Sequence, residues 1–333
     1  MAIKASGGNP PSNSLSFTEI ENEFGQNASR SLGDYRMNNL NIGALTEVSL
    51  SRDGCGISAN SNIPVDDQEI KFSDFFSAKQ NIILDFHSNN QNRVNAKNDK
   101  YNASSPSGNY TVVGSAGNSK PSSTNGKKVI IHVTKVIGSS QGNVNNVALR
   151  TGNWDSGTEL LVEVDGGTVI GAGGNGGNGQ SNNVGTPGTD GTSGLGIDYS
   201  GTKIQTAENG LIACGFGGGG AGGGARTKRE GSSWGGGRGP TVNIAGSGGG
   251  GGQGAPGGSG GSGGANGTAG DHEQAGEGGP ETEAESVESG VVGGNGGEGG
   301  HTGDASADAG EAGSLNGTRH EDPNTAGPGI GGG

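Results

Sequence analysis

Five side chains between positions 226 and 238 are the ones best suited to binding chemistry. Four are cationic and one is a tryptophan, and Arg and Trp are over-represented among residues that dominate binding energy at protein interfaces. The cluster predicts a recognition loop held between two glycine-rich segments. An equally weighted alternative is a solvated loop whose charges keep glycine-rich surroundings soluble. The five residues are Arg226, Lys228, Arg229, Trp234 and Arg238.

A second candidate recognition loop combines a histidine with many carboxylates. It consists of Asp271, His272 and Glu273, followed by an acidic run from 277 to 288. Like charges placed this closely repel one another, so a solvated loop is the default interpretation. Carboxylate oxygens can bind calcium, but the spacing matches neither an EF-hand nor a nonapeptide calcium repeat. We therefore predict no metal site.

Catalytic chemistry finds no support in the spacing of residues. Positions 215–224 contain matches to G-x-G-x-x-G after a predicted strand, but a dinucleotide site also needs a following helix. The stretch 225–232 is too short for that helix, and a chain with 77 glycines produces such matches by chance. No Ser/His/Asp or Cys/His set can be assembled, and nothing fixes two carboxylates at a useful separation. We expect a protein that is not an enzyme and has no cofactor.

Composition limits the partners and the kind of core. Of 333 residues only 27% are hydrophobic and 4% aromatic, which excludes one large apolar core. The net charge is −13, with no basic patch to displace counterions, so a nucleic acid partner is not expected. No stretch reaches the roughly 20 apolar residues of a membrane span. Cys55 and Cys214 have no metal-ligand spacing and are predicted to be small buried residues.

Glycine recurs with a period of three in the second half of the chain, which must position these loops. Sixty-two of the 77 glycines follow residue 165, and the pattern is clearest at 171–179, 257–265 and 293–301. Three residues per turn is the period of a polyproline-II helix, in which two glycine columns let neighbouring backbones approach. We predict a bundle of polyglycine-II rods. A flexible linker is the alternative; short runs and little proline exclude collagen.

The first part of the chain predicts a small helical module. Ser16 and Glu19 form a capping box, and Gly25 can close the helix after two turns. The apolar stripe is too small to be stable alone, so we expect the module to dock on another component. The docking candidates are Phe17, Ile20, Phe24, Leu32, Tyr35, Phe72, Phe75 and Phe76.

Residues 80–165 predict about five short strands, among them 81–86, 110–113, 128–137, 147–150 and 159–164. Further short strands are predicted at 168–170, 203–206, 211–214 and 241–245, as a β stem from which the rods project. The fold class is therefore mainly β with short N-terminal helices. We divide the chain into an attachment module (1–79), a small sandwich or jelly-roll-like domain (80–165), and a glycine-rich rod bundle with variable loops (166–333).

Three stretches resemble a known family. Leu-Ser-Phe-Thr-Glu-Ile-Glu-Asn-Glu-Phe-Gly, with Ile-Lys-Phe-Ser-Asp-Phe-Phe further on, resembles N-terminal segments of bacteriophage tail-fibre and other virion appendage proteins. The stretch Asp-Gly-Gly-Thr-Val-Ile-Gly-Ala-Gly-Gly-Asn-Gly-Gly-Asn-Gly is similar to the strand-to-glycine transition in glycine-rich tail-fibre tips. The resemblance covers 15–76 and 160–333, and it implies an adhesin of the T-even-like type, in which polyglycine-II rods carry receptor-contacting loops.

That resemblance implies a virion appendage protein, made in the host cytoplasm. It would bind other tail proteins through its N-terminal module and a host-surface polysaccharide or outer-membrane protein through its loops. Whether it forms a homo-oligomer is open. The alternative is a purely structural virion component, such as a tail or capsid-decorating connector, without receptor contact. An ice-binding or cell-wall glycine-rich protein is disfavoured, because the third column mixes Asn, Ser, Glu and His rather than regular Thr or Ala.

Overall fold

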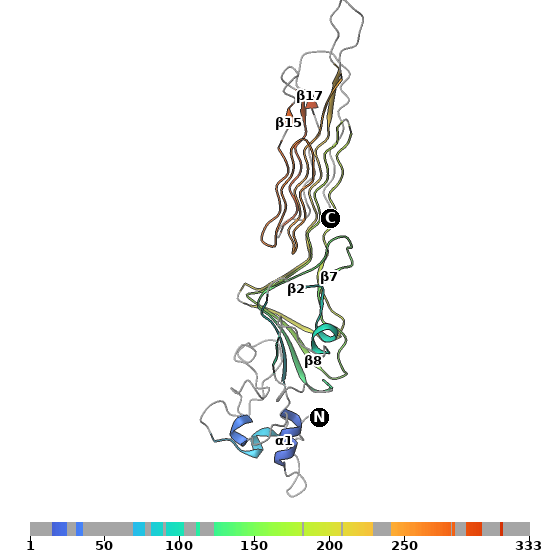
Figure 1. Ribbon diagram of the computed structural model, residues 1–333. Helices are drawn as coiled ribbons and strands as arrows, with labels where there is room; N and C mark the ends of the chain where they lie inside the picture. Colours follow the sequence, from blue (N-terminus) through green and yellow to red (C-terminus); the bar gives the residue numbers. More distant parts are fainter. Residues whose placement is uncertain are drawn as a thin grey trace, which may run out of the picture. The chain divides into compact units, whose positions relative to one another are not determined.

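The computed structural model (Figure 1) describes residues 15–24, 31–35, 69–76, 81–88, 91–102, 111–113, 123–181, 183–207, 209–228, 241–280, 282–283, 291–301 and 314–315. The chain forms two compact units. Unit 1 comprises Met1–Val136, Arg150–Thr168 and Ile197–Leu211, and unit 2 comprises Ile137–Leu149, Val169–Gly196 and Ile212–Gly333. Both units therefore draw residues from either side of position 166, where the glycine content changes.

Short helices open unit 1. Helix α1 spans Phe17–Phe24, and single helical turns follow at η1 (Leu32–Tyr35) and η3 (Phe72–Phe75). The predicted capping box is confirmed: the Ser16 amide donates to Glu19 Oε2 (2.8 Å), and the Glu19 amide donates to Ser16 Oγ (3.2 Å). A π-helical turn, η4 (Ala96–Tyr101), follows the short strands β2 (Gln91–Asn92) and β3 (Val94–Asn95).

A five-stranded sheet with the order β11-β8-β5-β1-β4 forms the core of unit 1. Three neighbouring pairs, β1–β5, β5–β8 and β8–β11, are parallel, and β4 is antiparallel to β1. Parallel sheets are buried on both faces, which requires near-continuous apolar strands. The strands are β1 (Asn81–Phe86), β4 (Thr111–Val113), β5 (Lys128–Val133), β8 (Glu159–Asp165) and β11 (Lys203–Ala207).

Two sequence predictions change here. The strand predicted at 128–137 is divided, because the chain leaves this sheet after Val133 and continues as β6 (Val136–Gly138), which lies beside β9 (Thr168–Ile170) in another sheet. The sandwich or jelly roll is not confirmed: those folds are antiparallel, whereas most pairs described in this sheet are parallel. The strands themselves were identified from apolar residues, but their near-continuous burial in β5 and β8 fits parallel pairing rather than the alternation of an antiparallel sandwich.

Further short strands accompany the glycine-rich part. They are β7 (Val147–Arg150), β10 (Ser193–Gly196) and β12 (Leu211–Ala213), with β7 next to β10 and β12 next to β9. Cys214 follows β12 and is exposed, so the prediction of a buried cysteine is wrong at this position. Its place just beyond the strand end leaves its side chain outside the packed region. Cys55 lies outside the described residues.

Extended glycine-rich segments, here called rods, run side by side through unit 2 (Figure 1). The innermost one, rod 246–254, shows how they are joined. Its amides donate in three rows, each to one neighbour: Gly249 and Gly252 to rod 171–179, Gly250 and Gln253 to rod 293–301, and Gly251 and Gly254 to rod 267–271. Every third residue thus faces the same neighbour.

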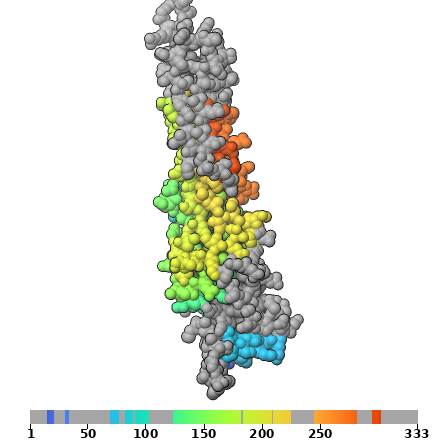
Figure 2. All heavy atoms as spheres, turned by 180° about the vertical axis from the view of Figure 1, so that it is seen from behind, coloured from blue at the N-terminus to red at the C-terminus, as the bar shows by residue number. Residues whose placement is uncertain are grey.

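The carbonyls of rod 246–254 face three further rods. They accept from rod 215–224 (Gly219 to Gly250), from rod 257–263 (Gly261 to Gly249) and from rod 274–280 (Gly276 to Gly251). The surrounding rods are also joined to one another. The Gly296 amide of rod 293–301 donates to the Gly279 carbonyl of rod 274–280, and the orange and red-orange atoms of these two rods lie together in Figure 2. Six surrounding backbones leave no room for a side chain on most inner positions.

Side-chain oxygens also accept hydrogen bonds from the amides of rod 171–179. The hydroxyls of Thr186, Thr189 and Thr192, spaced three apart on rod 185–192, accept from the amides of Asn178, Asn175 and Ala172. In turn the amide oxygens of Asn175 and Asn178 accept from the amides of Ser259 and Ser262. The third column predicted from sequence is therefore part of the hydrogen-bonding scheme.

Candidate functional site

The rods have two ends, and the hairpins gather at one of them. Rod 215–224 leads into the hairpin of β13 (Ala225–Lys228) and β14 (Thr241–Ile244), and rod 246–254 leads back. Rod 274–280 leads to β15 (Thr282–Glu283), which pairs with β16 (Val291–Gly293), and β16 pairs with β17 (Ser314–Leu315). Strands β13 and β14 both lie beside β16. We call this the hairpin end, and the other, with turns at 255–256 and 272–273, the turn end.

Two residues of the basic cluster, Arg226 and Lys228, lie on β13 at the hairpin end. Arg226 stands opposite Asn243 and Lys228 opposite Thr241 in the β13–β14 register. Arg229, Trp234 and Arg238 lie outside the described residues, between the two strands. The structure thus brings β13, the strand that carries Arg226 and Lys228, next to β16, whose partner strand β15 lies in the predicted acidic run.

Asp271, His272 and Glu273 lie at the turn end instead. The Asp271 carboxylate accepts from the amides of Glu273 (2.8 Å) and Gln274 (2.9 Å), and these backbone bonds lower the pKa of Asp271. His272 Nε2 is 3.8 Å from a carboxylate oxygen of Glu273, whose side chain is 81% exposed. This is a well-formed surface turn. It is separated from the hairpin end by the length of a rod, about 30 Å for ten residues rising ~3.1 Å each.

The predicted docking residues divide by burial. Ile20 and Phe75 are fully buried, so their side chains are not exposed for docking. Phe17, Leu32 and Phe76 are half-buried, and Phe72 is 43% exposed, with its ring 6.4 Å from that of Phe17 in an edge-on contact. Phe72 and its neighbour Phe17 therefore give the module an apolar surface. The side chains of Phe24 and Tyr35 are outside the described set.

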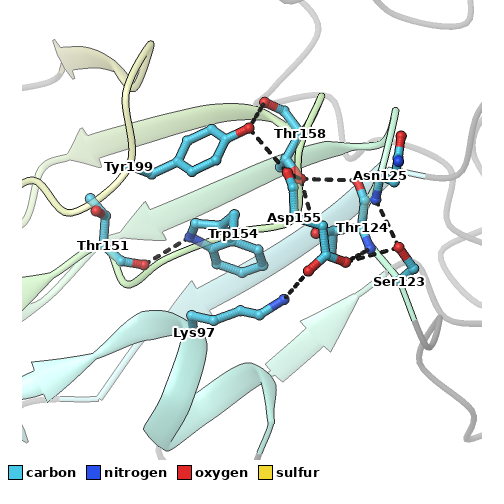
Figure 3. A network of polar contacts seen from close by, with 9 residues as sticks. All are labelled: Lys97, Ser123, Thr124, Asn125, Thr151, Trp154, Asp155, Thr158 and Tyr199. Carbon is cyan, nitrogen blue, oxygen red and sulfur yellow. Dashed lines mark hydrogen bonds and ion pairs between the residues drawn. The ribbon is translucent and has the colours of Figure 1, made fainter.

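A buried cation is the feature that sequence reasoning missed (Figure 3). Lys97 Nζ lies 4.6 Å from the ring centre of Trp154, 4.8 Å from that of Tyr101, and 3.6 Å from Asp155 Oδ1. Cation–π contacts of this kind are worth roughly 0.5–2 kcal/mol depending on desolvation. The only sequence signal was a lone Trp between two predicted strands.

The same network ties together loops of unit 1. Asp155 Oδ2 accepts from the Thr124 amide (2.7 Å), the bond that does most to lower the pKa of Asp155, and from Ser123 Oγ. Trp154 Nε1 donates to the Thr151 carbonyl (2.8 Å), and the Tyr199 hydroxyl donates to the carbonyls of Asp155 and Thr158. Trp154 is only 5% exposed, so its ring is part of the packed interior and the network around it stabilises the fold.

A second polar group crosses the five-stranded sheet. Asp85, His132 and Glu163 are in register on β1, β5 and β8. His132 Nδ1 lies 3.1 Å from Asp85 Oδ1 and its Nε2 lies 3.6 Å from Asp165 Oδ2. Burial alone would lower the pKa of His132, but the bond to Asp85 and the charges of Asp85, Glu163 and Asp165 raise it. The prediction that His132 is structural agrees with this placement.

Within the described ranges, no three His, Cys, Asp or Glu side chains come together in a way that could hold a metal ion. The described helices include none long and apolar enough to cross a membrane. The fold and site together define a mainly β protein that holds several hairpins at one end of a hydrogen-bonded array of glycine-rich rods.

Comparison with known proteins identifies the family. Residues 84–332 match the family model described as phage tail fibre adhesin Gp38. Because this match spans most of the chain, the protein belongs to that family. Among curated proteins no match was found. A solved structure, the gp37-gp38 adhesin tip complex of the bacteriophage S16 long tail fibre, is similar with 18% identity and a TM-score of 0.32, covering 74% of this chain and 75% of that one. At that score no structural argument rests on the likeness.

Proposed function

We propose that this protein attaches a phage to its host cell, as the adhesin of a tail fibre, through the loops at the hairpin end. The observation that carries the proposal is the convergence of β13–β14 and β15–β16–β17 at one end of the rods, in a member of the tail fibre adhesin family. Loops on a rigid scaffold are where binding residues gather. Binding of this kind requires no catalytic group.

The scaffold itself is proposed to be a polyglycine-II bundle. Support comes from the three rows of amides on rod 246–254, each facing one neighbour, and from the six backbones that surround it. A three-residue repeat of donors and acceptors is what a polyproline-II-type helix presents. Such a bundle would hold the β13–β14 and β15–β16 hairpins rigidly, because both ends of each of these two hairpins continue into rods that are bonded to several others.

Of the two loops predicted from sequence, the hairpin end is the better candidate for the receptor site. Arg226 and Lys228 lie there on β13, and Arg229, Trp234 and Arg238 follow in the sequence between β13 and β14. Asp271, His272 and Glu273 lie at the turn end, so one compact receptor surface cannot include both sets. The receptor would be a surface polysaccharide or an outer-membrane protein, without membrane insertion by the adhesin.

The N-terminal module is proposed to join the adhesin to another tail protein. The exposed ring of Phe72 and its edge-on contact with Phe17 provide an apolar contact surface. The protein would then reside at a virion tail appendage.

Competition for adsorption tests the receptor proposal. Purified protein, added to host cells before the phage, should reduce adsorption. A variant with Arg226, Arg229 and Trp234 changed to Ala should compete poorly while melting at the wild-type temperature. The matched control is Glu273→Ala, whose exposed side chain lies at the turn end, and it should compete like the wild type.

Two outcomes would count against the proposal. If the wild-type protein binds cells and the hairpin variant competes equally well, those residues do not form the receptor site. If the wild-type protein neither binds cells nor blocks adsorption, the alternative of a structural virion connector is favoured.

A further inference from the structure

A rod of pure glycine has a register problem. Its donors and acceptors repeat every three residues, so sliding one rod past another by three residues restores nearly every backbone hydrogen bond. Register is known to be weakly specified in glycine-rich extended segments. A shift of three residues would move the end of a rod by about 9 Å, at ~3.1 Å per residue. A loop carried on that rod would move with it.

Rod 246–254 carries two polar side chains in an otherwise all-glycine segment. Ser247 is fully buried and Gln253 is 3% exposed. Ser247 Oγ donates to the Pro280 carbonyl, and Gln253 Nε2 donates to the His272 carbonyl at 3.0 Å. These two carbonyls bracket rod 274–280, which leads to β15 at the hairpin end. The two side chains therefore form a hydrogen bond at each end of the neighbouring rod.

Gly250 lies midway between Ser247 and Gln253, in the same column of the rod. A Cβ built on Gly250 would overlap the carbonyl oxygen of Gly276, in the middle of rod 274–280. A three-residue slide in one direction would bring Ser247 to this position, and a slide in the other direction would bring Gln253 there. Either side chain would collide with a backbone carbonyl, which cannot rotate away as a side chain can.

We propose that Ser247 and Gln253 are positioning residues that fix the register of rod 274–280, and with it the height of the β15–β16 hairpin, by blocking a three-residue slide in both directions. The effect on host attachment rests on the function proposed above. The effect on register does not, because it follows from contacts within the rods.

The neighbouring inner rod 215–224 has the same arrangement with apolar residues. Phe216 is half-buried and Ala221 fully buried. Between them, a Cβ on Gly218 would overlap the Asn175 carbonyl and a Cβ on Gly219 would overlap the Gly297 carbonyl. A slide in one direction would place Ala221 at the position of Gly218, and a slide in the other would place Phe216 at that of Gly219. Both inner rods are thus blocked in both directions.

Glycine-selective ¹⁵N labelling tests the proposal on the full chain. Gly276, Gly278 and Gly279 of rod 274–280 should each give one amide signal in the wild type. The variant Ser247→Gly/Gln253→Gly removes both obstacles and should give two or more signals for each. The variant Ser247→Ala/Gln253→Ala removes the same hydrogen bonds but keeps both Cβ atoms, so it should keep one signal per glycine. Phage that carry the glycine variant, with its mixture of registers, should adsorb less well than wild-type phage, whereas phage that carry the alanine variant should adsorb normally.

One signal per glycine in the glycine variant would overturn the proposal, and so would multiple signals in the alanine variant, since hydrogen bonds rather than collisions would then set the register. If the double glycine variant does not fold, Ser247→Gly alone decides the question, because it opens the slide in one direction. Multiple signals with normal adsorption would uphold the register proposal while contradicting the attachment role of this hairpin.

Discussion

The interiors of the two units are built from different kinds of residue. In unit 1 the buried positions of the five-stranded sheet are large apolar side chains such as Leu84, Ile131 and Val162, all fully buried. In unit 2 the buried positions of rods 215–224 and 246–254 are nearly all glycine, and each rod is bonded through its backbone to several others. The first unit is stabilised by removing apolar area from water, and the second by hydrogen bonding and close backbone packing.

Because of this difference, unit 1 should be destabilised mainly by removing side-chain atoms from its interior, and unit 2 mainly by adding them. A side chain lost from unit 1 leaves a cavity, whereas a side chain gained in unit 2 meets a carbonyl that is itself held by hydrogen bonds. Two of the few side chains inside the rods, Ser247 and Gln253, accordingly bond to carbonyls at the ends of a neighbouring rod. The comparison can be tested from both sides.

The largest effect is expected from a deletion in unit 1. Leu84→Ala should destabilise that unit by about 2–5 kcal/mol, the usual range for Leu→Ala in a packed core. Urea denaturation followed by a probe in unit 1 measures the change. A loss below about 1 kcal/mol would mean that apolar packing is not the main source of stability in this sheet.

An insertion in unit 2 should have the next largest effect. A Cβ on Gly174 would overlap the Thr189 carbonyl, so Gly174→Val should destabilise the rods by about 1–3 kcal/mol or more. Thermal unfolding checks this, with Ala269→Val as the matched control, since Ala269 is exposed on rod 267–271. Equal melting temperatures for the two variants would contradict the close-packed rods.

The smallest effect is a pH dependence confined to unit 1. Because the pKa of His132 is raised in the folded state, the imidazolium contributes stability that is complete below its unfolded pKa of about 6.5 and is lost as the pH rises through the folded value. The facing groups are Asp85, Glu163 and Asp165, with His87 beside Asp85 at 3.6 Å. The unfolding free energy of the wild type should fall more steeply above pH 6 than that of His132→Gln. Parallel curves would show that His132 does not titrate with folding.

Several features of the fold could be predicted from local sequence. The capping box of Ser16 and Glu19 and the strands at 81–86, 159–164 and 168–170 are set by neighbouring residues, so the sequence alone indicated them. The three-residue glycine period likewise indicated segments that pack backbone to backbone, because at three residues per turn the extended chain presents two bare glycine columns to its neighbours. Host attachment itself was indicated by resemblance to a family, not by a residue pattern.

Long-range pairing was beyond the reach of the sequence. The direction of β5 against β8, the cage of Tyr101 and Trp154 around Lys97, and the placement of Asp271 at the end opposite Arg226 all depend on contacts between residues far apart in the chain. A period of three specifies that a rod can bond to neighbours but leaves open which neighbours and at what height. Sequence thus determined that the scaffold consists of glycine-rich rods, and tertiary structure decided their register. The reason is that the backbone hydrogen bonds of a rod are alike at every third residue, so only its few side chains distinguish one alignment from the next.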